Sequence, residues 1–98
     1  MGYNWCVIKG FKHSGLEKFF LTGRKSGIQP QHVARLRLIL GRLNASTCPN
    51  DMNLPGLYLH ELTGKKKGIW SVRVSCNWRV TFKFEGEDAV LVNYEDYH

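Results

Sequence analysis

The hydrophobic pattern of this 98-residue chain changes its period once, and this change sets the order of its helices and strands. In residues 33–43 apolar side chains recur at helical spacing on one face, at Val33, Leu36, Leu40 and Leu43. From residue 57 onward apolar and polar residues alternate, which is typical of strands with one buried face. Helices followed by a run of strands predict an α+β domain whose helices pack on one face of the sheet.

A short N-terminal strand and two helices are expected in the first half of the chain. Residues 7–11 form the strand, because they begin with β-branched side chains. The first helix begins at Ser14, since Ser14 and Glu17 match a capping box, and it ends at Gly23. The second helix begins near Pro30, because proline suits the first helical position. We therefore expect two helices packed together against whatever sheet the second half forms.

Four further strands, joined by tight turns, predict an antiparallel meander in residues 57–62, 69–75, 78–84 and 89–94. Alternation assigns their side chains to two faces. The face under the helices receives Leu57, Leu59, Trp70, Val72, Val74, Trp78, Val80, Phe82 and Phe84. The open face receives Tyr58, His60, Ser71, Arg73, Ser75, Arg79, Thr81 and Lys83. The open face is therefore cationic and carries a histidine and an aromatic ring.

The charges are distributed unevenly within a net charge of +6. Residues 1–79 hold 13 basic and three acidic side chains, whereas residues 80–98 hold one basic and five acidic ones. Arg35 and Arg42 lie off the apolar face of the second helix, where we expect them in water or at a partner. A basic body with a cationic sheet face favours a polyanionic partner, with nucleic acid as the first candidate. A sheet face that is merely solvated is the alternative.

The composition also limits which cellular compartment and which kind of chemistry are expected. No apolar run is long enough for a membrane span or a secretory signal, so a cytoplasmic protein without a membrane partner is expected. The cysteines, Cys6, Cys48 and Cys76, are odd in number and lack a C-x-x-C pair, which favours buried or half-buried free thiols over a bridge. No residue spacing resembles a metal site or a phosphate-binding loop, so neither metal nor cofactor is expected.

One chemistry fits the residue types that are present. RNA is cleaved without a metal when its 2′-hydroxyl attacks the adjacent phosphorus, a route that needs a base, cations around the phosphate and an acid for the leaving oxygen. His60, Arg79 and Lys65, with the run at residues 95–98, supply these types. His13 and His32 are interpreted as ordinary surface or helix residues without a role.

Four segments together carry a resemblance to a known family. They are LHELTG at residues 59–64, GIWSV at 68–72, NWRVTF at 77–82 and NYEDYH at 93–98. With these segments the chain resembles the HigB-type toxins, a branch of the RelE/ParE superfamily of type II toxin–antitoxin systems. The likeness begins near residue 8. It implies one RelE-like domain over residues 1–98, with residues 1–6 as an extension of uncertain origin.

The resemblance implies a ribosome-dependent mRNA endonuclease that cuts the message in the ribosomal A site. It implies important positions at His60, Asn77, Arg79, Asp96, Tyr97 and His98. In this hypothesis Arg79, helped by Lys65, stabilises the charge at phosphorus. Asp96 or His60 takes the 2′-hydroxyl proton, His98 or the protonated partner donates to the leaving oxygen, and Tyr97 contacts a base. Contacts to RNA or the ribosome are assigned to Lys65, Lys66, Lys67, Arg73, Asn77 and Lys83.

The resemblance also implies partners, and it leaves alternatives open. The partners are a cognate helix-turn-helix (HigA-type) antitoxin, the ribosome and mRNA. Thr63 departs from the family pattern, because some members carry a lysine at this place. One alternative is a ParE-like toxin that poisons DNA gyrase, although such a toxin has no need of acid–base groups such as His60, Asp96 and His98. The other is a non-catalytic nucleic-acid-binding module, which predicts salt-dependent binding without strand scission.

Overall fold

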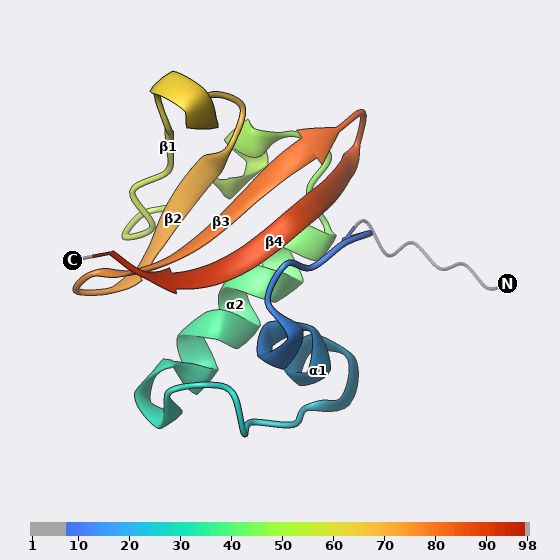
Figure 1. The fold of residues 1–98 in the computed structure, drawn as a ribbon, viewed down its shortest axis with the longest axis vertical. Coiled ribbons are helices and arrows are strands. Elements are labelled where there is room, and N and C mark those ends of the chain that lie inside the picture. Colours follow the sequence, from blue (N-terminus) through green and yellow to red (C-terminus); the bar gives the residue numbers. More distant parts are fainter. Residues whose placement is uncertain (1–7, 98) are drawn as a thin grey trace, which may run out of the picture.

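The structure, a computed structural model, describes residues 8–97 and shows two helices on one face of a four-stranded antiparallel sheet (Figure 1). The helices are α1 (Ser14–Thr22) and α2 (Val33–Asn44). The strands, in the spatial order β1-β2-β3-β4, are β1 (His60–Glu61), β2 (Trp70–Ser75), β3 (Trp78–Glu85) and β4 (Asp88–Asp96). Short 3-10 helices occupy connections at Pro30–His32, Pro49–Met52 and Gly64–Lys66. The predicted α+β fold class is confirmed.

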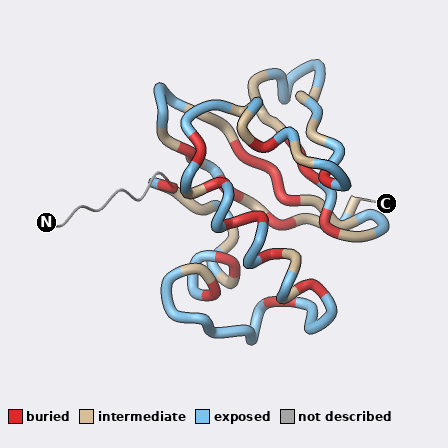
Figure 2. Tube along the Cα trace, turned by 180° about the vertical axis from the view of Figure 1, so that it is seen from behind, coloured by how far each residue is buried: buried red, intermediate tan, exposed pale blue. Residues whose placement is uncertain are grey.

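The core lies between α2 and the sheet, and the hydrophobic pattern explains why. Buried residues follow the centre of the sheet and one side of α2 (Figure 2). The fully buried side chains include Leu36, Ile39, Leu40, Leu43, Val72, Val80, Phe82 and Val92. Burying one such side chain stabilises the fold by about 1.5–3 kcal/mol. The predicted inner face is confirmed for β2 and β3, with Trp70, Trp78 and Phe84 half-buried at its margins.

The predicted N-terminal strand is reduced to two isolated bridges beside β4. Ile8 pairs with Ala89 and Phe11 pairs with Val92, both in parallel. The amide of Lys9 donates to the Ala89 carbonyl at 2.8 Å. The sheet is therefore mainly antiparallel with one parallel edge segment. Residue 7 of the predicted strand, like the extension of residues 1–6, lies outside the described part of the chain.

The start of α1 differs from the prediction. The N-cap is His13, whose ring Nδ1 accepts a hydrogen bond from the Leu16 amide at 3.0 Å. The predicted capping box of Ser14 and Glu17 is therefore wrong, because His13 has the extended backbone of a cap and the Glu17 amide donates to the His13 carbonyl at 3.1 Å. The predicted end at Gly23 is confirmed, and its φ of 82° explains why glycine stands there.

The predicted strand at residues 57–62 is also wrong in extent, since β1 contains only two residues. Gly56 and Tyr58 both have positive φ, at 85° and 52°, so the chain turns there instead of extending. Leu57 still points inward, with 1% exposure, and its carbonyl accepts from the Arg73 amide at 2.7 Å. Tyr58 points outward, but a turn and not strand alternation places it there.

At the other end of the sheet, β4 runs two residues beyond its predicted end at Tyr94. Asp96 pairs with Trp78, and Glu95 pairs with Arg79. The register of β4 shifts at a bulge that contains Leu91, whose φ is 54°. The acidic residues before the C-terminus therefore belong to the sheet, which fixes the face on which each of them lies.

Two further expectations concern the cysteines and the membrane. Cys48 and Cys76 are free thiols, but both are exposed, so the prediction of buried or half-buried thiols is wrong for them. Both lie in connections outside the core, Cys48 before a 3-10 helix and Cys76 in the β2–β3 turn. Cys6 lies outside the described residues.

Among residues 8–97, no helix has the length and apolar character that crossing a bilayer requires.

His32 is a buried residue of the core, contrary to its interpretation as ordinary. It is 3% exposed, and its Nδ1 lies 2.7 Å from the Tyr94 hydroxyl. The same hydroxyl oxygen accepts from the Gln29 amide at 3.3 Å, so Tyr94 joins the His32 ring to the segment before it. Burial lowers the pKa of His32 below its usual value of 6.5, since a charged imidazolium is disfavoured there.

We expect the melting temperature to fall as the pH drops from about 7.5 to about 5. The unfolded chain protonates His32 near its ordinary pKa of 6.5, whereas the folded chain resists protonation, so acid favours unfolding. Thermal unfolding followed by circular dichroism across this range measures the slope. His32→Gln reduces the slope, while the control His60→Gln, at an exposed histidine, keeps it. Equal slopes for all three chains contradict this account.

Candidate active site

The sheet face opposite the helices carries two parallel rows of polar side chains. Register places His60, Ser71, Thr81 and Asn93 side by side in one row. Two residues further along each strand, a second row contains Arg73, Arg79 and Glu95. The rows are about 7 Å apart and neighbouring strands about 5 Å apart. We call this surface the outer face.

Arg79 occupies the centre of the second row. It lies on β3, between Arg73 on β2 and Glu95 on β4. Its side chain is half-buried, and its Nε makes no hydrogen bond to any of the described residues. The stem of the side chain is thus held in the sheet surface, and the guanidinium group is placed to bind an anion.

Tyr97 adjoins this row immediately after β4. Its amide donates to the Asn77 carbonyl at 2.8 Å, which fixes the C-terminal segment to the β2–β3 turn. Burial and the negative charge of Glu95 raise the pKa of Tyr97, while the positive charge of Arg79 lowers it. Tyr97 therefore lies within electrostatic reach of both neighbours and keeps its proton at neutral pH.

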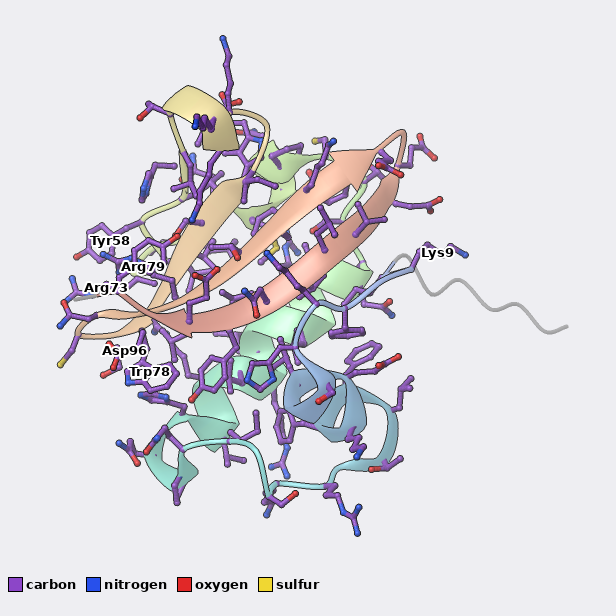
Figure 3. The ribbon with its side chains drawn as sticks, viewed as in Figure 1. Lys9, Tyr58, Arg73, Trp78, Arg79 and Asp96 are labelled. Carbon is purple, nitrogen blue, oxygen red and sulfur yellow. The ribbon has the colours of Figure 1, made fainter. Side chains whose placement is uncertain are left out.

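An aromatic ring flanks the row on the other side. The Arg73 guanidinium lies 5.5 Å from the centroid of the Tyr58 ring, and Tyr58 is 67% exposed. Figure 3 shows Tyr58, Arg73 and Arg79 gathered at one end of the sheet. Strand alternation predicts Tyr58 on the open face but assigns it no role. An exposed aromatic side chain among cations was the signal in the sequence.

Arg35, on helix α2, holds the loop that leads to Tyr58 and the backbone of Arg73. Its guanidinium donates to the carbonyl oxygens of Gly56 and Arg73, so it ties the loop before Tyr58 to β2. The expectation that Arg35 lies in water or at a partner is therefore wrong. Arg42 likewise donates to the Asp51 carbonyl at 3.1 Å. Both arginines thus bind carbonyl groups of their own chain, which lie before Tyr58, in β2 and in the 3-10 helix at Pro49–Met52.

His60 shares the outer face with Arg79 but not its row. It is exposed on β1, two strands away, and it pairs with Ser71. Its Nδ1 lies 3.5 Å from the Tyr58 carbonyl. The two side chains are close enough to contact one extended RNA segment. His98, the other predicted acid–base histidine, lies outside the described residues.

Asp96 lies on the opposite face of the sheet. It pairs with Trp78 and borders a cleft on the helix side, together with His13, Gln29 and Tyr94. Figure 3 shows Asp96 and Trp78 on the side of the strands away from Arg79. The structure thus does not bring Asp96 together with Arg79 and His60, and its catalytic role stays a prediction.

Glu95, and not Asp96, carries the carboxylate of the outer face. Its Oε2 accepts hydrogen bonds from the Thr81 hydroxyl at 3.2 Å and from the Asn93 side-chain amide at 2.9 Å. From the sequence, Glu95 is expected only as one member of the run at residues 95–98. If the strand alternation is extended from Asn93 to Tyr97, Glu95 falls on the same face as Arg79. This pattern was the signal in the sequence.

The predicted RNA-contacting residues are spread along the outer face and its margins. Lys65 and Lys66 belong to the 3-10 helix after β1, and Lys67 follows it; all three are exposed. Asn77 is exposed in the turn that holds Tyr97. Lys83 is half-buried on β3, four residues from Arg79 and therefore about 13 Å along the strand.

Comparison with known proteins shows the family of this chain. Residues 9–98 match the family model of the RelE-like toxin HigB of type II toxin–antitoxin systems. The chain belongs to this family. A curated relative, Endoribonuclease HigB of Proteus vulgaris, is 42% identical over 92 residues, which are 94% of this chain and 100% of that protein. The RelE-like fold and the HigB resemblance are confirmed, and membership of a toxin–antitoxin family implies a cognate antitoxin.

In this member of the HigB family, Thr63 is the N-cap of the 3-10 helix at Gly64–Lys66, and its side chain makes no capping hydrogen bond. Thr63 is exposed, and Lys65 and Lys66 follow on the same loop. The two lysines therefore supply positive charge on the loop that contains Thr63. No group of three or more His, Cys, Asp and Glu side chains with the geometry of a metal site occurs within residues 8–97.

Proposed function

We propose that this chain is a ribosome-dependent mRNA endonuclease that cleaves the message in the ribosomal A site and so stops translation. The family membership makes it a toxin of a type II toxin–antitoxin system, and the Proteus vulgaris relative, named an endoribonuclease, supports that enzyme class. One observation carries the finer proposal. The outer face gathers Arg73, Arg79, His60, Tyr58 and Tyr97, which are the residue types that RNA cleavage requires.

The proposed reaction is an attack of the 2′-hydroxyl on the adjacent phosphorus. The new bond joins the 2′-oxygen to phosphorus, and the bond from phosphorus to the 5′-oxygen breaks. Negative charge grows on the non-bridging oxygens during this step. Arg79 faces this charge with a guanidinium that is held in the sheet, and Arg73 and Lys65 add positive charge from the same face.

Two protons move in this reaction. His60 takes the 2′-hydroxyl proton in the proposal, because it shares the outer face with Arg79 whereas Asp96 does not. His98 donates a proton to the departing 5′-oxygen, an assignment that rests on the family resemblance alone. Tyr97 keeps its hydroxyl proton and binds the RNA as a hydrogen-bond donor or stacking ring.

The layout of the site supports ribosome dependence. His60 is exposed, and it lies two strands from Arg79 on an open sheet surface. In-line attack requires the 2′-oxygen, the phosphorus and the leaving oxygen to be nearly collinear, and an open surface does not impose this geometry on a flexible strand. A codon that the ribosome holds in a fixed shape arrives already oriented.

We also propose that the cognate antitoxin is of the helix-turn-helix, HigA type and that it binds the helical side. A groove between α1 and α2 is lined by Phe19, Phe20, Arg37 and Leu40. Leu21 and Leu38 expose 65% and 55% of their surface on the same two helices. An apolar groove with a cation at its edge suits an amphipathic acidic segment. Binding there leaves Arg79 uncovered, so neutralisation acts by blocking entry into the ribosome.

The chemistry of the cut ends tests the proposed reaction. Attack by the 2′-hydroxyl leaves a 2′,3′-cyclic phosphate on one fragment and a 5′-hydroxyl on the other. We therefore expect the downstream fragments to accept an adapter in RNA ligation only after treatment with a polynucleotide kinase. The control is the same mRNA cut by a nuclease that leaves 5′-phosphates, which ligates without treatment. Downstream fragments of the toxin reaction that ligate directly contradict the mechanism.

A further inference from the structure

A depression of about 140 Å³ lies on the outer face beside the candidate active site, and of its lining only Lys65 has a part in the proposed reaction. It lies between the 3-10 helix at Gly64–Lys66 and strand β4. Its walls differ in chemistry from one part to the next. Apolar lining comes from Leu62, Ile69 and Leu91, positive charge from three lysines, and polar groups from Thr81, Asn93 and Glu95.

The carboxylate of Glu95 is held in one orientation. Both hydrogen bonds, from the Thr81 hydroxyl and the Asn93 amide, go to Oε2. Thr81 is 3% exposed, so its hydroxyl is a fixed part of the sheet surface. Since a carboxylate oxygen accepts about two hydrogen bonds, Oε2 is saturated and Oε1 is the acceptor that remains for a ligand. The Asn93 side chain has its nitrogen toward Glu95, so its oxygen is a second acceptor.

Leu91 gives the depression an apolar wall that the fold does not need for its core. It is 47% exposed and has a φ of 54°, which β-strand leucines rarely adopt. The β4 bulge creates this conformation. The apolar side chains of Leu91 and Ile69 therefore line the same depression as the polar groups of Glu95 and Asn93.

The charged side chains around the depression determine how a bound nucleotide is oriented. Lys12, Lys65 and Lys66 border the depression, whereas Glu95 is its carboxylate. A nucleotide carries its negative charge on the phosphate and its neutral hydrogen-bonding edge on the base, so its phosphate belongs with the lysines and its base with Glu95.

We propose that this depression binds one nucleotide of the RNA substrate and selects a base with an exocyclic amino group over uracil. The proposal rests on the proposed function in taking RNA as the substrate. Adenine, cytosine and guanine each present an amino N–H that Glu95 Oε1 accepts. Uracil presents its N3–H between two carbonyl oxygens, which the carboxylate repels. Glu95 and Asn93 are specificity-determining residues in this account.

Titration of the isotope-labelled chain with nucleoside 5′-monophosphates, followed by NMR, tests the proposal without ribosomes. We expect AMP, CMP and GMP to shift the amide signals of Leu91, Asn93 and Glu95, and UMP to bind about tenfold more weakly. Glu95→Gln reverses the preference toward UMP, because its oxygen accepts from Thr81 and Asn93 and its NH₂ group then faces the uracil O4. Glu87→Gln, the same charge change in the β3–β4 turn, keeps the wild-type preference.

A second variant removes the apolar wall. Leu91→Asn preserves the fold, because asparagine adopts positive φ readily and the side chain is half exposed. We expect it to weaken binding of all four nucleotides.

Three results each overturn the proposal: equal binding of UMP and AMP in the wild-type chain, no effect of Glu95→Gln, or NMR shifts confined to the Arg79 region. Cleavage of mRNA without nucleotide binding overturns the pocket alone, whereas nucleotide binding without cleavage supports the pocket and overturns the endonuclease.

Discussion

Arg79→Ala is expected to slow mRNA cleavage by about two to three orders of magnitude and to leave the fold intact. Arg79 lies in the centre of the outer face, where in the proposed mechanism its guanidinium group meets the charge that develops on phosphorus. Loss of one fixed donor at such a position removes transition-state stabilisation that water does not replace. The fold is preserved because Arg79 is only half-buried and lies on the outer face, away from the core between α2 and the sheet.

Single-turnover cleavage of mRNA on programmed ribosomes measures this effect. Arg79→Lys restores part of the rate, since lysine keeps the charge but loses the planar fork of donors. Arg24→Ala is the matched control, because Arg24 is an exposed arginine in the connection after α1 and lies away from the sheet. A wild-type cleavage rate in folded Arg79→Ala removes this residue from the mechanism.

The fold was predictable where short-range periodicity decides the outcome. The spacing of Leu36, Leu40 and Leu43 predicts the buried face of α2, and the alternation in β2 and β3 predicts the inner face of the sheet. The sequence did not reveal the turn at Tyr58, because a positive φ in a residue other than glycine has no local signature. The pairing of His32 with Tyr94 joins residues 62 positions apart, and no local pattern encodes such a contact.

The candidate site was predictable in part for the same reason. Alternation placed His60, Arg73 and Arg79 on the open face, as the register shows. The acidic residues near the C-terminus were harder to place, because the face of each depends on whether β4 continues past Tyr94. It does continue, so Glu95 lies beside Arg79 and Asp96 lies on the other face. An extension of two residues thus decides which carboxylate adjoins the cations.

Dependence of cleavage on the ribosome is the second large effect that this account expects. The outer face is open, and its proposed base and cation are on strands separated by a third strand. Aligning the 2′-oxygen with the scissile bond is worth several orders of magnitude in rate, and the fold itself supplies little of it. Free mRNA is therefore expected to survive at toxin concentrations that destroy the same message during translation.

The measurement that tests the central claim most directly is the mapping of mRNA 5′ ends after the purified chain is added to translating ribosomes. A ribosome-free sample of the same message and a sample with Arg79→Ala are the controls. The account predicts cuts at in-frame positions in the translating sample and none in either control. Cuts that are equally frequent without ribosomes contradict ribosome dependence. The absence of cuts in every sample from a folded chain contradicts the endonuclease and points to another target, such as DNA gyrase.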